Sequence, residues 1–164
     1  MLSNWHMNKK MRILLEDVLE YSNKEKLELN VEQLQKLFFP PFKKVKDCII
    51  IAEESSDELE RYFDNAIKMY MNKTAFEYSN TEVRMGDFFE SKVSMETETQ
   101  LALFAIEIWI LRLKQLELNA KYCFIMSCDK ERVEIRFHKV REEGIWLDEN
   151  LENYKEGAIG YRLA

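Results

Sequence analysis

The chain has 164 residues and a formal net charge of −6, from 24 basic and 30 acidic side chains. Its length suits one domain with its own core, and only four glycines and two prolines exclude collagen-like and low-complexity architectures. The three cysteines lack a zinc-type spacing, and their odd number fits a reducing compartment. The most apolar stretch, 101–113, is shorter than the roughly 20 residues needed to span a bilayer. We therefore expect a cytoplasmic protein.

The first 50 residues are expected to be mainly helical. Apolar residues at helical spacing predict a first helix at about 8–22. Asn30 is a suitable N-cap for a second helix at about 31–38, which the two following prolines end. The apolar run 48–52 fits either a buried strand or the lead-in to the next helix.

Ser55 or Ser56 can cap a third helix, whose apolar stripe continues to about residue 72. Aromatic and polar residues then alternate at 76–78, and 81–85 is a second short extended candidate. The strongest helical pattern covers 96–118 and is apolar on nearly all sides. Such a helix is expected to be central, packed on both a sheet and other helices. A role as an oligomer interface is the alternative.

Strands are predicted at 122–127, 132–138 and 158–163, the first two joined by a hairpin loop. In the second strand one face is apolar and is expected to contact the long helix, through Val133, Ile135 and Phe137. The other face is polar and is expected to point to solvent or to a partner, through Arg132, Glu134, Arg136 and His138.

Helices first and antiparallel strands last predict an α+β fold. The N-terminal helices and the long central helix would pack on a small antiparallel sheet formed mainly by the C-terminal part. We expect one domain over 1–164, with a helical N-terminal part at 1–50 and the main α+β core at 51–164.

Signals for chemistry are weak. The only histidines, His6 and His138, have no metal-binding spacing. His138 could act as a general base, but no nucleophile motif accompanies it. Asp87 followed by Glu90 and Lys92 loosely fits a metal-dependent nuclease. The negative charge balance argues against a nucleic-acid substrate, because phosphate contacts need clustered lysines and arginines. We therefore expect no catalytic residues, no metal and no cofactor.

Two segments concentrate the negative charge. Residues 53–64 carry six acidic side chains against one arginine, and residues 142–156 carry six against one lysine. Each run has a net charge of −5. Either run could be a solvated face, or a docking surface for a basic partner, since complementary charge accelerates encounter. In the second run Trp146 and Tyr154 could either anchor the segment or act as binding hot spots.

The C-terminal block resembles small bacterial immunity proteins encoded beside secreted toxins. The resemblance covers about 95–164 and is carried by four segments: 108–113 (IWILRL), 122–127 (YCFIMS), 136–138 (RFH) and 146–151 (WLDENL). It implies a non-enzymatic inhibitor of a toxin.

The sequence thus favours an immunity or antitoxin-like protein that occludes a basic toxin domain through an acidic surface. The expected partner-binding residues are Glu142, Glu143, Trp146, Asp148, Glu149, Glu152, Tyr154, Arg136 and His138. Residues 53–64 are the other candidate interface. The partner would be the cognate toxin, with no nucleic acid and no membrane involved. The alternatives are another protein-interaction or structural module, or a small hydrolase or nuclease.

Overall fold

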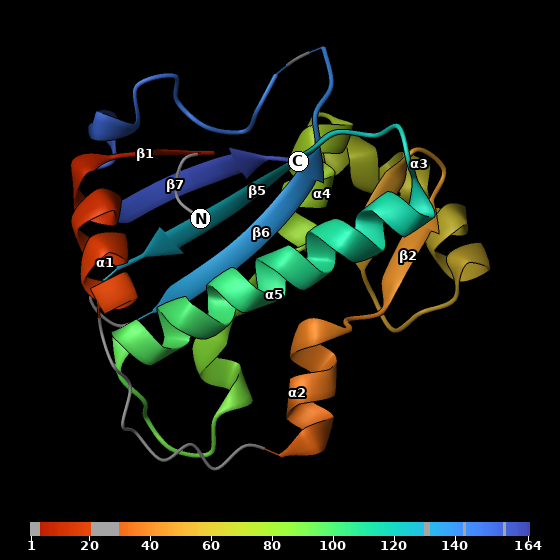
Figure 1. Cartoon of the computed structure of the whole chain (residues 1–164). Coiled ribbons are helices and arrows are strands. Elements are labelled where there is room, and N and C mark those ends of the chain that lie inside the picture. Colours follow the sequence, from red (N-terminus) through yellow and green to blue (C-terminus); the bar gives the residue numbers. More distant parts are fainter. Residues whose placement is uncertain (1–3, 21–29, 130–131, 143, 156) are drawn as a thin grey trace.

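The fold is α+β, with helices around an antiparallel sheet (Figure 1). The computed structural model describes residues 4–20, 30–129, 132–142, 144–155 and 157–164. The elements in chain order are β1 (Trp5–Met7), α1 (Lys9–Glu20), α2 (Val31–Phe38), β2 (Phe42–Val45), β3 (Cys48–Ile51), α3 (Ser56–Tyr70), α4 (Lys73–Asn80), β4 (Val83–Arg84), a 3₁₀ turn (Met85–Phe88), α5 (Met95–Leu116), β5 (Tyr122–Cys128), β6 (Val133–Lys139), a second 3₁₀ turn (Leu151–Asn153) and β7 (Ala158–Leu163).

The main sheet has the strand order β1-β7-β5-β6-β4, and α5 crosses one of its faces (Figure 1). The three C-terminal strands form the centre of this sheet, as the sequence predicts. The edge strand β1 comes from the N-terminus, and Trp5 pairs with Arg162 of β7. The helical N-terminal part predicted at 1–50 therefore also contains strands, and its boundary falls inside β3. β1 was missed because three residues carry too little pattern to predict a strand.

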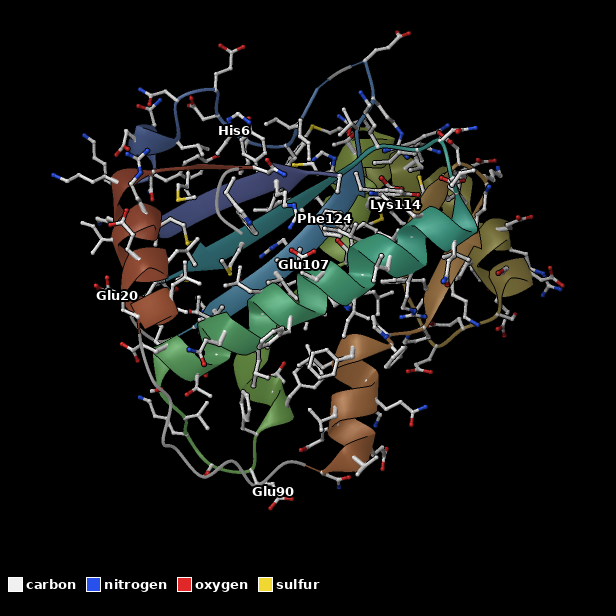
Figure 2. The ribbon with its side chains drawn as sticks, in the orientation of Figure 1. His6, Glu20, Glu90, Glu107, Lys114 and Phe124 are labelled. Atoms are coloured by element: carbon white, nitrogen blue, oxygen red, sulfur yellow. The ribbon has the colours of Figure 1, made fainter. Side chains whose placement is uncertain are left out.

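The core lies between the main sheet and α5. Val133, Ile135 and Phe137 are fully buried there, which confirms the predicted register of β6. Phe137 packs edge-on against Trp109 of α5, with ring centroids 6.0 Å apart. Phe124 of β5 lies in the same layer, between the sheet and the helix (Figure 2).

The outer side of α5 is open to solvent. Phe104 is 58% exposed and Leu111 is 63% exposed. The helix packs on both the sheet and other helices, as the sequence predicts, but it leaves this apolar side uncovered. Its apolar circumference is wider than the surface that the sheet, α1 and α2 cover. No helix in the described ranges is both long and apolar enough to cross a membrane.

A second, smaller core joins the β2–β3 hairpin to α3 and α4, through Val45, Cys48, Ile50, Phe63 and Phe76. The ambiguous run at 48–52 is thus a strand. Ser55 caps α3 and forms a capping box with Glu58, which confirms the predicted start of that helix. The extended structure predicted at 76–78 is wrong, because Asn72 caps the short helix α4 by accepting a hydrogen bond from the Ala75 N–H at 2.8 Å.

Candidate functional site

The acidic run 142–156, called the C-terminal connection from here on, joins β6 to β7. Its described part covers the face of the main sheet opposite α5. Its apolar side chains point inward: Ile145, Leu147 and Tyr154 pack on a cluster that includes Cys123 and Ile125 of β5. The predicted solvated face of the sheet is therefore largely covered. Because the anchors are used within the fold, this segment presents mainly its polar side chains.

Trp146 and His138 hold this segment to β6. The Trp146 ring is half-buried and lies 5.9 Å from the ring of Tyr78, centroid to centroid. The backbone N–H of Trp146 donates to Nε2 of His138 over 3.2 Å, and Nδ1 of His138 lies 3.1 Å from the carbonyl oxygen of Lys139. An imidazole that accepts at Nε2 carries its proton at Nδ1, which is the neutral tautomer. The prediction that His138 points to solvent or a partner is wrong, because its side chain is fully buried under this segment.

Arg136 is also used within the fold. Its guanidinium pairs with Glu82 at 2.7 Å and with Glu134 at 2.9 Å, and lies over the Tyr78 ring at 4.6 Å from the centroid. The side chain is only 16% exposed. Arg136 was predicted to bind a partner, but two carboxylates already compensate its charge. It joins β6 to the segment before β4.

Four predicted acidic residues of the connection are exposed: Glu142, Asp148, Glu149 and Glu152. Asp148 accepts hydrogen bonds from the Asn153 side chain and the Asn150 N–H, and these lower its pKa. Oε1 of Glu152 accepts from the Lys9 N–H at the start of α1, at 2.8 Å. Two of the four carboxylates therefore make contacts within the fold. Asp148 bonds inside the segment, and Glu152 bonds to the start of α1. Glu143 lies outside the described residues.

The other acidic run, residues 53–64, covers the start of α3. Glu54, Asp57 and Glu60 are exposed, and their side chains have no hydrogen bond or ion pair within the described part of the chain. Asp64 pairs with Lys46 at 2.7 Å. Among the described residues, more carboxylates are therefore without a partner here than in the C-terminal connection.

A groove of about 340 Å³ opens between α3, α4 and β3. Its apolar wall consists of Ile50, Leu59, Phe63, Ala66 and Phe76. Its polar rim consists of Glu54, Glu58, Arg61, Tyr62 and Asn80. Tyr62 is 68% exposed. The sequence placed acidic residues here but gave no sign of a cavity, because the groove forms between elements separated along the chain.

A buried carboxylate joins the hairpin to the main sheet. Glu77 of α4 is fully buried, and its Oε1 accepts from the Ile49 N–H of β3 at 2.8 Å. Its Oε2 accepts from the Lys139 N–H of β6 at 2.8 Å and pairs with Arg141 at 2.7 Å. Sequence reasoning missed Glu77, because nothing in its local pattern distinguishes it from a surface glutamate.

Glu117 forms a second ionic junction near Glu77. Burial opposes its ionisation, but hydrogen bonds from Lys44, Lys139 and Tyr122 outweigh burial and lower its pKa to about 2. Lys139 bridges Glu117 at 2.9 Å and Asp47 at 3.0 Å. These pairs connect β2, β6 and the end of α5. We read them as structural, since the charges compensate each other.

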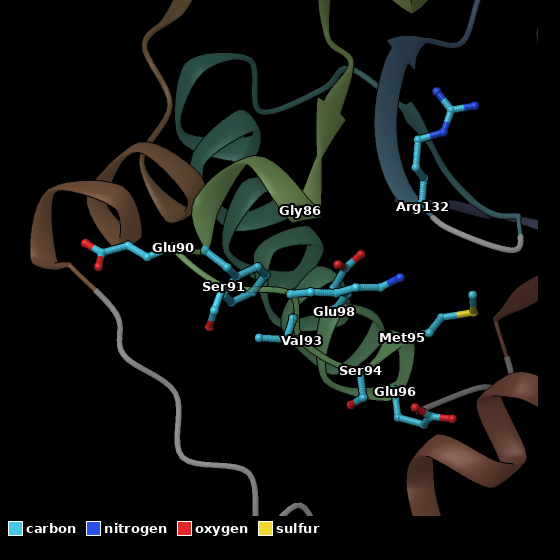
Figure 3. Close-up of a pocket in the computed structure, with 11 residues that line it drawn as sticks. Gly86, Glu90, Ser91, Val93, Ser94, Met95, Glu96, Glu98 and Arg132 are labelled. Atoms are coloured by element: carbon cyan, nitrogen blue, oxygen red, sulfur yellow. The ribbon is translucent and has the colours of Figure 1, made fainter.

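A polar cavity of about 540 Å³ lies at the start of α5 (Figure 3). Glu98 points into it, is 8% exposed, and has its pKa raised by burial. Arg132 lies across the cavity and pairs with Asp129 at 3.1 Å. Glu90 and Lys92 line this cavity, whereas Asp87 lines a different one. The loose nuclease pattern is thus divided between two cavities.

Other groups that sequence reasoning weighed for chemistry are distributed over the fold. Among the described residues, no three His, Cys, Asp or Glu side chains are arranged to hold a metal ion. The three cysteines are free and buried. Burial raises the pKa of Cys48, Cys123 and Cys128 to about 12, so these thiols stay protonated at neutral pH.

Comparison with known proteins gives one match. The model of the family described as "Uncharacterized protein PM0498 family" matches residues 6–162, which is nearly the whole chain. The chain therefore belongs to that family. Neither the curated proteins nor the solved structures contain a match.

Proposed function

We propose that this member of the PM0498 family is a non-enzymatic, cytoplasmic immunity protein that binds a basic toxin domain and blocks its active site. One observation carries the proposal. Both acidic runs have exposed carboxylates that no cation among the described residues neutralises: Glu142 and Glu149 in one, and Glu54, Asp57 and Glu60 in the other. The resemblance of 95–164 to toxin-associated immunity proteins supplies the class of partner.

Inhibition would be steric and electrostatic. Exposed carboxylates steer a basic partner toward this surface and disfavour acidic competitors. The anchored C-terminal connection holds Glu142 and Glu149 on a folded backbone, so less conformational entropy is lost when a partner binds. Trp146 and Tyr154, both half-buried, would supply apolar contact beside them. No cofactor takes part.

Co-expression with the neighbouring reading frame tests this function. We expect the neighbouring product alone to arrest growth, and co-expression of this chain to restore growth and to yield a complex on size-exclusion chromatography. Phe137→Ala, which empties a core site and destabilises the fold, serves as the destabilised control. A toxic neighbour that the stably expressed chain neither binds nor neutralises would contradict the proposal.

A further inference from the structure

The groove between α3, α4 and β3 combines an apolar wall with an acidic rim. Leu59, Ala66 and Phe76 form part of the wall, and Glu54 and Glu58 lie on the rim. Lysine and arginine side chains have an apolar stem and a charged head, and they bury the stem on apolar surface while the head stays near polar groups. The groove offers both halves of that arrangement.

The two carboxylates on the rim differ in whether they already accept hydrogen bonds within the fold. Oε2 of Glu58 accepts hydrogen bonds from the Ser55 side chain at 2.8 Å and the Ser55 N–H at 3.2 Å, because it completes the capping box. Glu54 has no partner within the described residues. Glu54 is therefore free to receive a cation without any loss to the fold. Arg61 is the one cation among the residues that line the groove, and it opposes such a ligand.

An exposed aromatic ring stands beside the carboxylates. Tyr62 lines the groove and is 68% exposed. Tyrosine at the edge of a pocket is typical of binding hot spots, and its ring face also attracts a guanidinium or ammonium group. A part-buried apolar wall, an exposed aromatic ring and exposed carboxylates thus meet at the start of α3.

A cavity also lies beside the C-terminal acidic connection, but the carboxylates that line it are paired with an arginine. That cavity, of about 330 Å³, is lined by Asp129 and Glu134 together with Arg132 and Lys155. Arg132 contacts both carboxylates, Asp129 at 3.1 Å and Glu134 at 3.7 Å. A cationic side chain entering it would have to displace an existing ion pair, which the groove at α3 does not require.

We propose that the groove between α3, α4 and β3 receives a lysine or arginine side chain of the basic partner, with Glu54 pairing the cation and Tyr62 packing on the stem. This assignment rests on the proposed function, since it names the surface that the toxin domain contacts. It places the anchor of the complex on residues 53–66, and the exposed carboxylates of 142–152 at its periphery.

Matched charge variants test the assignment through the dissociation constant for the toxin domain. Glu54→Lys is expected to weaken binding about tenfold or more, and Arg61→Gln to tighten it about threefold, because they change the rim charge in opposite directions. Glu142→Lys makes the same charge change outside the groove and is expected to weaken binding less than about threefold. All three side chains are exposed, so each variant is expected to fold, and a thermal melt of each variant checks this.

Titration of the folded chain with N-acetylarginine methylamide tests the groove without any toxin. Its neutral control is N-acetylcitrulline methylamide, which has nearly the same shape. We expect the arginine compound alone to shift the amide resonances of Leu59, Ala66 and Phe76, and Glu54→Lys to abolish the shifts. Equal shifts with both compounds, or none at the groove, would overturn the assignment.

The two proposals fail separately. If the wild-type chain does not bind the toxin, the proposed function is wrong. If it binds the toxin but Glu54→Lys and Arg61→Gln leave the dissociation constant unchanged while Glu142→Lys weakens it, the groove assignment is wrong and the function stands.

Discussion

The two faces of the main sheet are buried by different kinds of interaction. On one face Val133, Ile135 and Phe137 of β6 pack on α5 in a dry apolar layer. On the other face, Arg136 and His138 of the same strand are covered through ion pairs, ring contacts and one hydrogen bond to the acidic connection. The first face stabilises by excluding water from apolar area. The second combines an apolar cluster around Cys123 and Ile125 of β5 with polar groups of β6 that are satisfied in fixed geometry.

The two faces therefore place different requirements on their side chains. The apolar face needs only side chains of suitable size at alternating positions. The polar face needs specific partners, which the inner side of the C-terminal connection supplies. The exposed carboxylates of the connection lie on its outer side. Mutations on the two faces should therefore differ in how much unfolding free energy they cost and in how many residues they affect.

The largest effect is expected on the apolar face. Phe137→Ala should lower the free energy of unfolding by about 3–5 kcal/mol, since it empties a fully buried aromatic site. Urea denaturation measures the change. Phe104→Ala on the exposed side of α5 is the matched control and should cost less than about 1 kcal/mol. Equal losses in the two variants would mean that the register of β6 is wrong.

A buried polar change should cost almost as much. Glu77→Ala leaves the N–H groups of Ile49 and Lys139 without their acceptor and Arg141 without its closest carboxylate. We expect a loss of about 3 kcal/mol in unfolding free energy, typical of breaking a buried ion pair. Glu60→Ala, an exposed helical glutamate, is the control. A loss below about 1 kcal/mol in Glu77→Ala would show that Glu77 does not join the hairpin to the sheet.

Acid should weaken the fold through Glu117. Its pKa is lowered from 4.5 to about 2 in the folded state, so the unfolded chain binds the proton first as the pH falls. This contribution is complete above pH 4.5 and is lost progressively down to about pH 2. Its size is on the order of 2–3 kcal/mol. Urea denaturation of Glu117→Gln should show a flatter pH dependence over this range, and an unchanged slope would contradict the role of Glu117.

The smallest effect is expected where the connection meets β6. His138→Leu removes the acceptor of the backbone N–H of Trp146, and one unsatisfied, partly buried donor costs about 1–2 kcal/mol. Hydrogen exchange should accelerate in residues 144–155 and stay slow in β5. Uniform acceleration across the sheet would instead show that His138 supports the core rather than the connection.

These differences also explain what could be predicted from the sequence. The apolar alternation of β6 and the caps Asn30 and Ser55 are local signals, and they gave the α+β class, the register and the helix starts. Glu77 has no such signal, because its partners Ile49 and Lys139 lie 28 and 62 residues away in sequence. β1 was missed for a similar reason, since it is defined by pairing with β7 at the other end of the chain.

For the candidate site too, local signals were predictable from the sequence and long-range contacts were not. Composition located both acidic runs, and both carry exposed carboxylates. It could not distinguish a carboxylate used within the fold, such as Glu152 or Asp148, from one without a partner, such as Glu54. The inward orientation of His138 depends on the connection that covers it, and alternation alone places that side chain only on the face opposite Phe137.

Hydrogen exchange of the chain, free and bound to the toxin domain encoded beside it, tests the central claim most directly. We expect binding to slow exchange in residues 53–66, with smaller protection in 144–155 and none on the exposed side of α5. Protection centred on α5 near Phe104 and Leu111, with 53–66 unchanged, would show that the partner docks on the apolar helix and would contradict an acidic interface.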